Sequence, residues 1–213
     1  MNFKSYFLLF LTVAIPNVWS QTSSQAQRLL ESASRQMETY ENIEFEFSYV
    51  LNNRTEQINQ ESSGKVIIAK EKYKLNFLDA IQIFNGKQLY TIVPENEEIT
   101  IIQLDDQEDL IFNPKEFLQF YKEGYNYFWD ISQRVKGKNI QFVKLIPTND
   151  NKDLKFLLVG IDTKLNHIYK LIEVGNNGTQ TTLTINKMKV NNSLPQNLFV
   201  FDEDNYPNYY IND

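Results

Sequence analysis

The sequence predicts an α+β domain in which an antiparallel β-sheet packs two or three helices against one face. Two observations indicate this fold class. Apolar residues recur mainly with the period of two that is typical of half-buried strands, over about ten segments. Short polar turns join these segments, and strands do not alternate with helices as they do in a parallel sheet.

The first periodic segment predicts a helix between Ser24 and Tyr40. Its apolar residues return at intervals of three and four, which places them on one helical face. Ser24, with Gln27 three residues later, has the spacing of a capping box. From Ile43 to Leu51 the period changes to two, and this change predicts the first strand of the sheet.

The same alternation and the turns between segments predict the other strands. Asn85-Gly86, between two apolar segments, is the strongest hairpin signal in the chain. The predicted strands cover residues 65–69, 73–77, 81–84, 88–93, 98–104, 141–146, 155–162, 167–174, 180–190 and 198–202.

A second helix is predicted to begin at Asn113, where Asn fits the N-cap, Pro114 the first helical position and Glu116 the third. Gly124 is placed to end it. Residues 125–129 follow directly, and we interpret them as an unusually aromatic connection.

The start of the chain has the pattern of an export signal. A short positively charged segment precedes the apolar run 6–15, which is too short to cross a bilayer as a helix. Val18 and Ser20 fit the −3 and −1 positions of a cleavage site, although an uncleaved anchor is the alternative. We therefore expect residues 1–20 to be a signal peptide and residues 21–213 to form a single domain.

Composition excludes several classes of function. The net charge of −6 argues against nucleic acid and anionic membrane surfaces as partners. The chain has no cysteine, so it has no disulfides, no thiolate chemistry and no site for N-terminal lipidation on cysteine.

The sequence offers little for catalysis, and we expect no catalytic residue, cofactor or metal. His167 is the single histidine, and its position after a predicted turn favours a solvated hairpin residue. Acidic residues cluster at 105–109 and 202–204, where they suit turns between strands. A hydrolase that uses paired carboxylates is the enzymatic alternative, and it would need close, buried carboxylates on the inner sheet face.

Aromatic residues make up 14% of the chain and gather on the predicted strands. A wide sheet with large side chains and few covering helices tends to leave a concave apolar space. Periodicity alone does not distinguish a space packed by the protein itself from one that takes a ligand. The inner face would carry Phe45, Phe47, Tyr49, Tyr73, Leu75, Phe77 and Tyr90.

Over residues 24–212 the chain resembles the periplasmic outer-membrane lipoprotein carrier family, which is also called LolA-like. Each similar sequence motif is short, but the order and spacing of the motifs together are specific to the family. The motifs are the helix exit YENIEFEF at 40–47, the Gly-led strand at 64–68, the Asn-Gly-Lys turn and strand at 85–94, the strand ending in Pro at 142–147, and the Phe-x-Phe strand with a Pro-containing tail at 199–207.

The resemblance implies an unclosed, strongly curved sheet, or half-barrel, with helices as a lid over its concave apolar face. It implies a monomeric periplasmic carrier that takes acylated lipoproteins from an ABC-type transporter of the inner membrane to an outer-membrane acceptor. The acyl chains would lie between the sheet and the helices. The side chains expected to line that space are Phe45, Phe47, Tyr49, Tyr73, Leu75, Phe77, Tyr90, Phe117 and Phe120.

One departure from the family pattern concerns the lid. Well-studied members carry an Arg after the Gly-led strand that holds the lid closed, and the corresponding place here reads Lys70-Glu71-Lys72. Lys70 and Lys72 are therefore the candidates for the lid latch, although a lysine lacks the forked geometry of arginine.

Two alternatives share the fold. One is a sensor of stray lipoproteins, which usually carries a second domain. The other is a periplasmic protein that binds a different lipid or lipid-like molecule.

Overall fold

The computed structural model describes residues 18–103, 124–149 and 153–212. Its single α-helix in these ranges is α1, Val18–Glu38, and the side chains are described from Ser23 onward. The strands are β1 Ile43–Asn53, β2 Ile58–Ala69, β3 Lys72–Phe77, β4 Ala80–Phe84, β5 Gln88–Val93, β6 Glu98–Gln103, β7 Tyr125–Val135, β8 Lys138–Pro147, β9 Leu154–Asp162, β10 His167–Gly175, β11 Gln180–Val190 and β12 Tyr210–Asn212.

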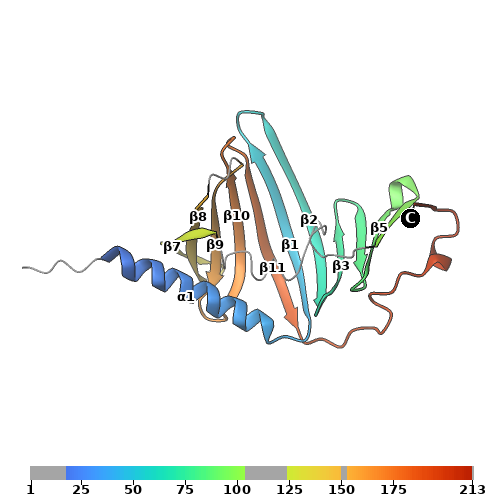
Figure 1. Ribbon diagram of the computed structural model, residues 1–213, viewed down its shortest axis with the longest axis horizontal. Coiled ribbons are helices and arrows are strands. Elements are labelled where there is room, and N and C mark those ends of the chain that lie inside the picture. Colours follow the sequence, from blue (N-terminus) through green and yellow to red (C-terminus); the bar gives the residue numbers. More distant parts are fainter. Residues whose placement is uncertain (1–17, 104–123, 150–152, 213) are drawn as a thin grey trace, which may run out of the picture.

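All the strands belong to one curved sheet (Figure 1). Its order is β12-β6-β5-β4-β3-β2-β1-β11-β10-β9-β8-β7. Every neighbouring pair is antiparallel except β12 and β6, which are parallel. β1 pairs with β2 on one side and with β11 on the other, so it joins two runs of consecutive hairpins. The predicted unclosed, mostly antiparallel sheet is confirmed.

The predicted two or three helices are not confirmed. The described residues hold one α-helix, besides the 3₁₀ turns η1, Pro94–Asn96, and η3, Glu203–Asn205. The second predicted helix begins at Asn113 and lies outside the described residues, except for Gly124. Residues 1–17, which include most of the expected signal peptide, also lie outside them.

Two local predictions were wrong. Residues 125–129 are the first part of β7 and not a connection, and residues 198–202 form turns and irregular backbone instead of a strand. In β7, Tyr125, Tyr127 and Trp129 lie opposite Pro147, Leu145 and Val143 of β8. Because opposite residues in an antiparallel pair point to the same face, these three rings share one face of the sheet.

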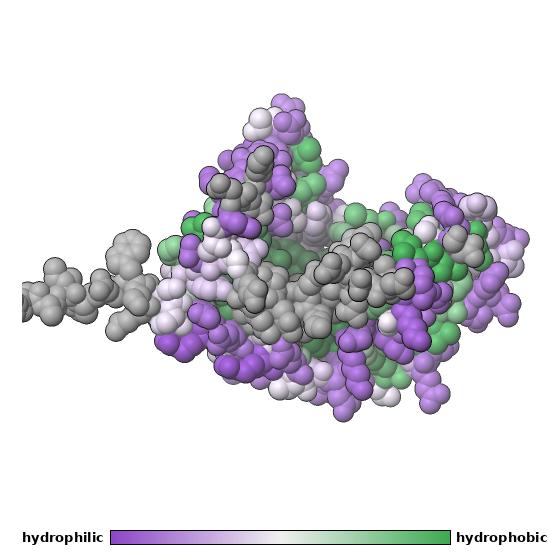
Figure 2. All heavy atoms as spheres, in the orientation of Figure 1, coloured by the Kyte–Doolittle hydropathy of each residue, from purple (hydrophilic) through white to green (hydrophobic). Residues whose placement is uncertain are grey.

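The register defines two faces of the sheet. We call the face that bears Phe45 the inner face and the face that bears Glu44 the outer face. Phe45 lies opposite Val66 of β2, and Val66 lies opposite Leu75 of β3, so the inner face is apolar across these strands. Figure 2 shows hydrophobic residues in the hollow of the molecule, between hydrophilic residues along its rims.

Helix α1 packs on the part of the sheet formed by β7, β9 and β10 (Figure 1). Its buried residues Ala26, Leu30, Ala33 and Met37 follow the helical spacing and belong to the same cluster as the inner-face residues. The helix thus covers the end of the inner face that β7, β9 and β10 form.

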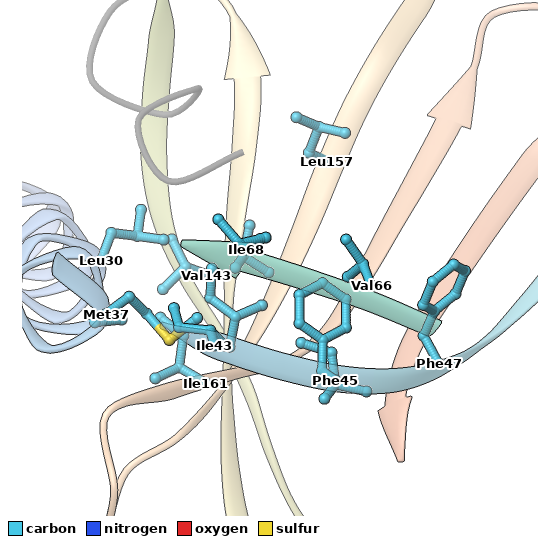
Figure 3. Close-up of a cluster of buried hydrophobic side chains, with 14 of the residues drawn as sticks. Leu30, Met37, Ile43, Phe45, Phe47, Val66, Ile68, Val143, Leu157 and Ile161 are labelled. Atoms are coloured by element: carbon cyan, nitrogen blue, oxygen red, sulfur yellow. The ribbon is translucent and has the colours of Figure 1, made fainter. Parts of the chain in front are cut away.

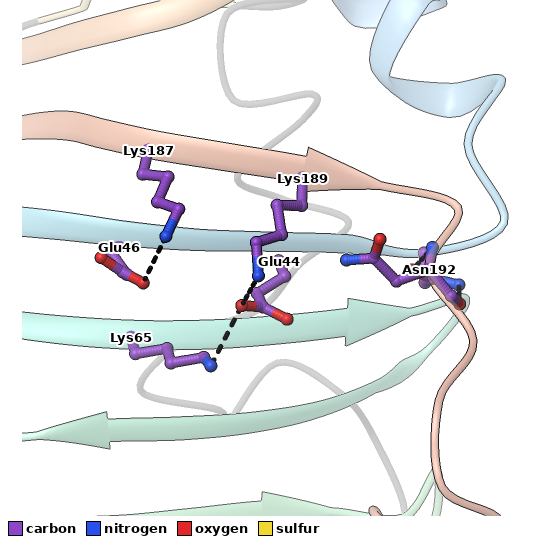
Figure 4. A network of polar contacts seen from close by, with 7 residues as sticks. Glu44, Glu46, Lys65, Lys187, Lys189 and Asn192 are labelled. Carbon is purple, nitrogen blue, oxygen red and sulfur yellow. Dashed lines mark hydrogen bonds and ion pairs between the residues drawn. The ribbon is translucent and has the colours of Figure 1, made fainter.

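The outer face carries charge at its centre and an apolar patch at one end. Glu44 lies 3.0 Å from Lys65 and 3.6 Å from Lys189, so the carboxylate bridges β1 to both neighbouring strands (Figure 4). The hydrogen bond from Lys65 is the main cause that lowers the pKa of Glu44, and burial opposes it. Glu46 and Lys187, 3.8 Å apart, form a more exposed pair.

The C-terminal segment covers the outer face of β4, β5 and β6. Ile83, Tyr90, Ile92 and Ile99 are buried there, and they pack against four residues of the segment. These four residues are Phe201, Tyr206, Tyr209 and Ile211. β12 then adds itself to the edge of β6, with Ile211 opposite Ile99.

Candidate ligand-binding face

The central cluster joins side chains from the helix and from both halves of the sheet (Figure 3). Leu30 and Met37 come from α1, Phe45 and Phe47 from β1, and Leu157 from β9. In Figure 3 their side chains converge on one interior. The face is therefore continuous from α1 to β3. The one buried charged side chain among the described residues, Asp162, lies opposite Ile140, which belongs to another cluster.

Aromatic rings form a chain of contacts along this face. Phe47 lies 6.0 Å from Phe45 and 5.4 Å from Phe77 between ring centroids, and Tyr49 lies 5.3 Å from Phe77. These separations are typical of favourable aromatic pairs. Tyr73 is fully buried 5.7 Å from Phe84, and burial raises its pKa to about 12. A large apolar surface with a few polar tips is suited to holding hydrocarbon.

Glycine makes the approach of one ring possible. A Cβ atom on Gly64 of β2 would lie 2.3 Å from the ring of Phe47 and 2.9 Å from the carbonyl oxygen of Asn76. Phe47 lies opposite Gly64 and covers it. Only a residue without a side chain allows the ring to lie flat on the sheet here.

The structure brings together six of the nine side chains expected to line the space. Phe45, Phe47 and Tyr73 are buried members of the central cluster, and Tyr49, Leu75 and Phe77 are partly buried and pack against it. The structure therefore supports their placement on one face. Whether they contact acyl chains is a proposal taken up below.

Tyr90 is a correction, because it lies on the outer face. Tyr90 lies opposite Ile83, and Ile83 points outward because the next residue, Phe84, points inward. The ring of Tyr90 stacks on Phe201, with 4.6 Å between the ring centroids. Leu89, the preceding residue, is the one that reaches the central cluster. Phe117 and Phe120, the other two candidates, lie outside the described residues.

Lys70 lies in the turn between β2 and β3, and Lys72 is the first residue of β3. With Glu41, Asn42 and Gly86 they line an open pocket of about 730 Å³ at the end of the sheet where β1 begins. Within the described ranges, the side chain of neither lysine forms a hydrogen bond or an ion pair. The second predicted helix of the lid lies outside those ranges, so the latch remains a prediction.

Sequence reasoning missed several members of the cluster. Tyr125, Tyr127 and Trp129 pack against it from β7, and Val143 and Leu157 are buried in it from β8 and β9. The signal was present in β7 as aromatic residues two positions apart. Phe128 between them obscured the alternation, since it is aromatic and yet points to the other face, opposite Lys144.

His167 is a second correction. It is half-buried, and its Nε2 lies 2.7 Å from the hydroxyl of Tyr40, which follows α1 in the chain. Gln36 donates a hydrogen bond to the same hydroxyl at 2.8 Å. Burial lowers the pKa of His167, Asp162 opposes this effect and Lys138 adds to it. The histidine therefore links the helix to β10.

The geometry gives no support for hydrolysis by paired carboxylates. Asp162 is the one buried carboxylate among the described residues, and its Oδ1 accepts the backbone N–H of Lys164 in a turn. The acidic cluster at 202–204 lies in the exposed turn η3, and the cluster at 105–109 lies outside the described ranges. The part of the chain that the structure describes contains no group of three or more acidic or histidine side chains able to hold a metal. No helix in that part is long and apolar enough to span a bilayer.

Residues 17–188 match the protein family described as "Outer membrane lipoprotein carrier protein LolA". The chain belongs to this family. The match covers α1 and the strands β1 to β10 completely and most of β11, so it includes the whole central cluster. No curated protein matches the chain.

Solved structures resemble the fold at low sequence identity. LprF from Mycobacterium bovis is 12% identical with a TM-score of 0.50, over 82% of this chain and 98% of that one. A LolA superfamily protein from Nitrosomonas europaea is 11% identical with a TM-score of 0.42, over 83% and 97%. The complex of MucA and MucB from Pseudomonas aeruginosa gives 13% and 0.42, over 86% and 62%. The likeness to LprF supports the fold alone.

Proposed function

We propose that this protein is a non-enzymatic periplasmic carrier that binds the acyl chains of lipoproteins on its inner face and moves them from the inner to the outer membrane. Membership of the lipoprotein carrier family and the continuous apolar face from α1 to β3 support the proposal. Its partners would be an ABC-type transporter of the inner membrane and an acceptor in the outer membrane.

The observation that carries the proposal is the line of large rings on the inner face. Phe45 and Phe47 of β1 and Phe77 of β3 present aromatic surface in a continuous line, with Phe47 between the other two. Burial of an acyl chain contributes about 0.8 kcal/mol per CH₂ group, so part of one chain gives substantial affinity. Three long chains would exceed the ceiling of about 20 kcal/mol for non-covalent binding. The carrier therefore needs to cover only part of its cargo.

The same arithmetic defines how transfer works. The carrier competes with a membrane on one side and with the acceptor on the other. Small differences in affinity then set the direction of transfer, because the cargo moves to whichever site binds it with the more favourable free energy. No nucleotide hydrolysis is needed at this protein.

Native mass spectrometry tests the proposal on the chain from Gln21 onward. The protein is incubated with a triacylated lipoprotein in detergent and then diluted below the micelle threshold. We expect a one-to-one complex, which Phe77→Glu abolishes because it places a carboxylate among the rings. The matched control is Asn76→Glu, since Asn76 is exposed and points to the outer face one position earlier.

The outcomes separate the candidate functions. Loss of the complex in both variants would indicate general damage, and circular dichroism on each variant detects it. If the wild-type protein binds no lipoprotein but retains a phospholipid or fatty acid, the result would favour the alternative function, a binding protein for another lipid on the same fold.

A further inference from the structure

Gln82 of β4 is a buried polar side chain, 7% exposed, whose Oε1 has no hydrogen-bond partner among the described residues. Five other buried polar side chains of those ranges form hydrogen bonds, namely Ser34, Asn42, Asn53, Gln141 and Asp162. A buried acceptor without a donor carries the full cost of its desolvation, so its presence calls for a functional explanation.

Gln141 shows how a buried glutamine amide is satisfied in the same sheet. It faces the irregular stretch of β7 between Trp129 and Ser132, where the ladder is interrupted. Its Nε2 donates to the carbonyl oxygens of Asp130 and Phe142, and its Oε1 accepts from the Ser132 hydroxyl. Gln141 therefore supplies a hydrogen-bond donor to the backbone of β7 where the ladder is interrupted. The ladders of Gln82 with β3 and β5 are regular, so Gln82 has no comparable role.

The position of Gln82 points to the ligand-binding face. Gln82 lies opposite Leu75 of β3 and Thr91 of β5, and Thr91 lies opposite Thr100 of β6. On the other side of Gln82, the same row of cross-strand neighbours runs from Leu75 to Val66 of β2 and then to Phe45 of β1. One row across the inner face is thus apolar over β1 to β3 and polar over β4 to β6, and Gln82 stands at the boundary.

The apolar and polar parts of this row are complementary to an acylated molecule, in which a hydrocarbon chain ends in a polar amide or ester linkage. We propose that Gln82 Oε1 accepts a hydrogen bond from an N–H group at the base of a ligand's acyl chain, with the hydrocarbon directed toward β1 to β3. The inference rests on the proposed carrier function and deepens it, since it selects N-acylated ligands over ligands that carry esters only.

A cycle of two ligands and two proteins tests the assignment. The ligands are a synthetic lipopeptide acylated through a secondary amide and its analogue methylated at that amide nitrogen, which has lost the N–H group. The proteins are the wild-type chain from Gln21 onward and Gln82→Met. We expect the wild type to bind the N–H ligand about tenfold more tightly than the analogue, and Gln82→Met to bind both equally.

Stability supplies a second readout. Replacing an unsatisfied buried amide by an apolar side chain of similar length should leave the melting temperature unchanged or raise it. Gln141→Met is the matched control: it should lower the melting temperature, because it removes the bonds to β7, and should keep the preference for the N–H ligand.

Four results would overturn the inference. Equal binding of both ligands by the wild type removes the role of the N–H group but leaves the carrier function intact. A preference that persists in Gln82→Met assigns the acceptor to another residue, and a melting temperature that falls as in Gln141→Met makes Gln82 structural. If the wild type binds neither ligand, the carrier function fails together with the inference.

Discussion

At the scale of single residues, the turn between β3 and β4 has an unusual sequence for its backbone. Leu78 and Asp79 both have positive φ, at 49° and 59°, as in the two-residue turn that favours Asn-Gly. Leu78 is also 63% exposed. A leucine in the left-handed region is strained, and its exposure returns no packing energy.

We predict that Leu78→Asn with Asp79→Gly stabilises the protein by about 1 kcal/mol, because the pair fits this turn. For a protein of this size that is a rise of about 2–4 °C in melting temperature, measured by circular dichroism. Leu165→Asn is the control, since Leu165 is exposed in another turn without positive φ. A decrease in stability of the double variant would show that Leu78 makes a contact that its exposure does not suggest.

The burial of His167 predicts a pH dependence of stability. The native state lowers the pKa of His167, so the unfolded chain binds its proton more readily. Stability is therefore full above the unfolded value of about 6.5 and falls as pH drops from there toward the lowered native pKa. Glu44 acts in a separate window, because its lowered pKa contributes stability above about 4.5 that is lost in stronger acid.

Urea unfolding at a series of pH values between 5 and 8 measures this effect. We expect the slope to be present in the wild type and absent in His167→Gln, which keeps a polar side chain near Tyr40 but has no proton to gain. A slope that is unchanged in the variant would assign it to another group.

At the scale of elements, the C-terminal segment behaves as a clamp on the outer face. Phe201 stacks on Tyr90 at 4.6 Å and lies 5.7 Å from Tyr206. We predict that Phe201→Ala lowers the free energy of unfolding by about 2–3 kcal/mol, because it removes a ring from between two others.

Val200→Ala is the matched control, because Val200 is the adjacent residue and is 58% exposed. It should change stability by less than about 0.5 kcal/mol. Equal effects of the two substitutions would mean that the segment does not hold the outer face of β4 to β6 in solution.

The same segment explains what sequence reasoning could and could not find. The alternation in β1 placed Phe45 and Phe47 correctly, since polar residues mark the other face of that strand. In β5 both Leu89 and Tyr90 are buried, because the segment covers the outer face there as well. With apolar residues on both faces of β5, no local pattern distinguishes the inner face from the outer one, and the predicted inward position of Tyr90 is therefore wrong.

At the scale of the whole molecule, the fold class followed from the sequence because most strands are joined as hairpins, which are local. The pairings of β1 with β11 and of β6 with β12 are distant in the chain, and no local signal announced either. The unsatisfied amide of Gln82 was equally hidden, since its significance depends on the partners that surround it in space.

The position of α1 has a consequence for how the chain reaches its native state. The helix precedes β1 in sequence, yet it docks on β7, β9 and β10, all of which lie beyond residue 124. Hairpins form early, because closing a short loop costs little entropy. Docking of α1 on these strands closes a long stretch of chain, so it costs more entropy than the formation of a hairpin does. We expect this docking, and not the formation of the hairpins, to limit the rate at which the protein becomes fully native.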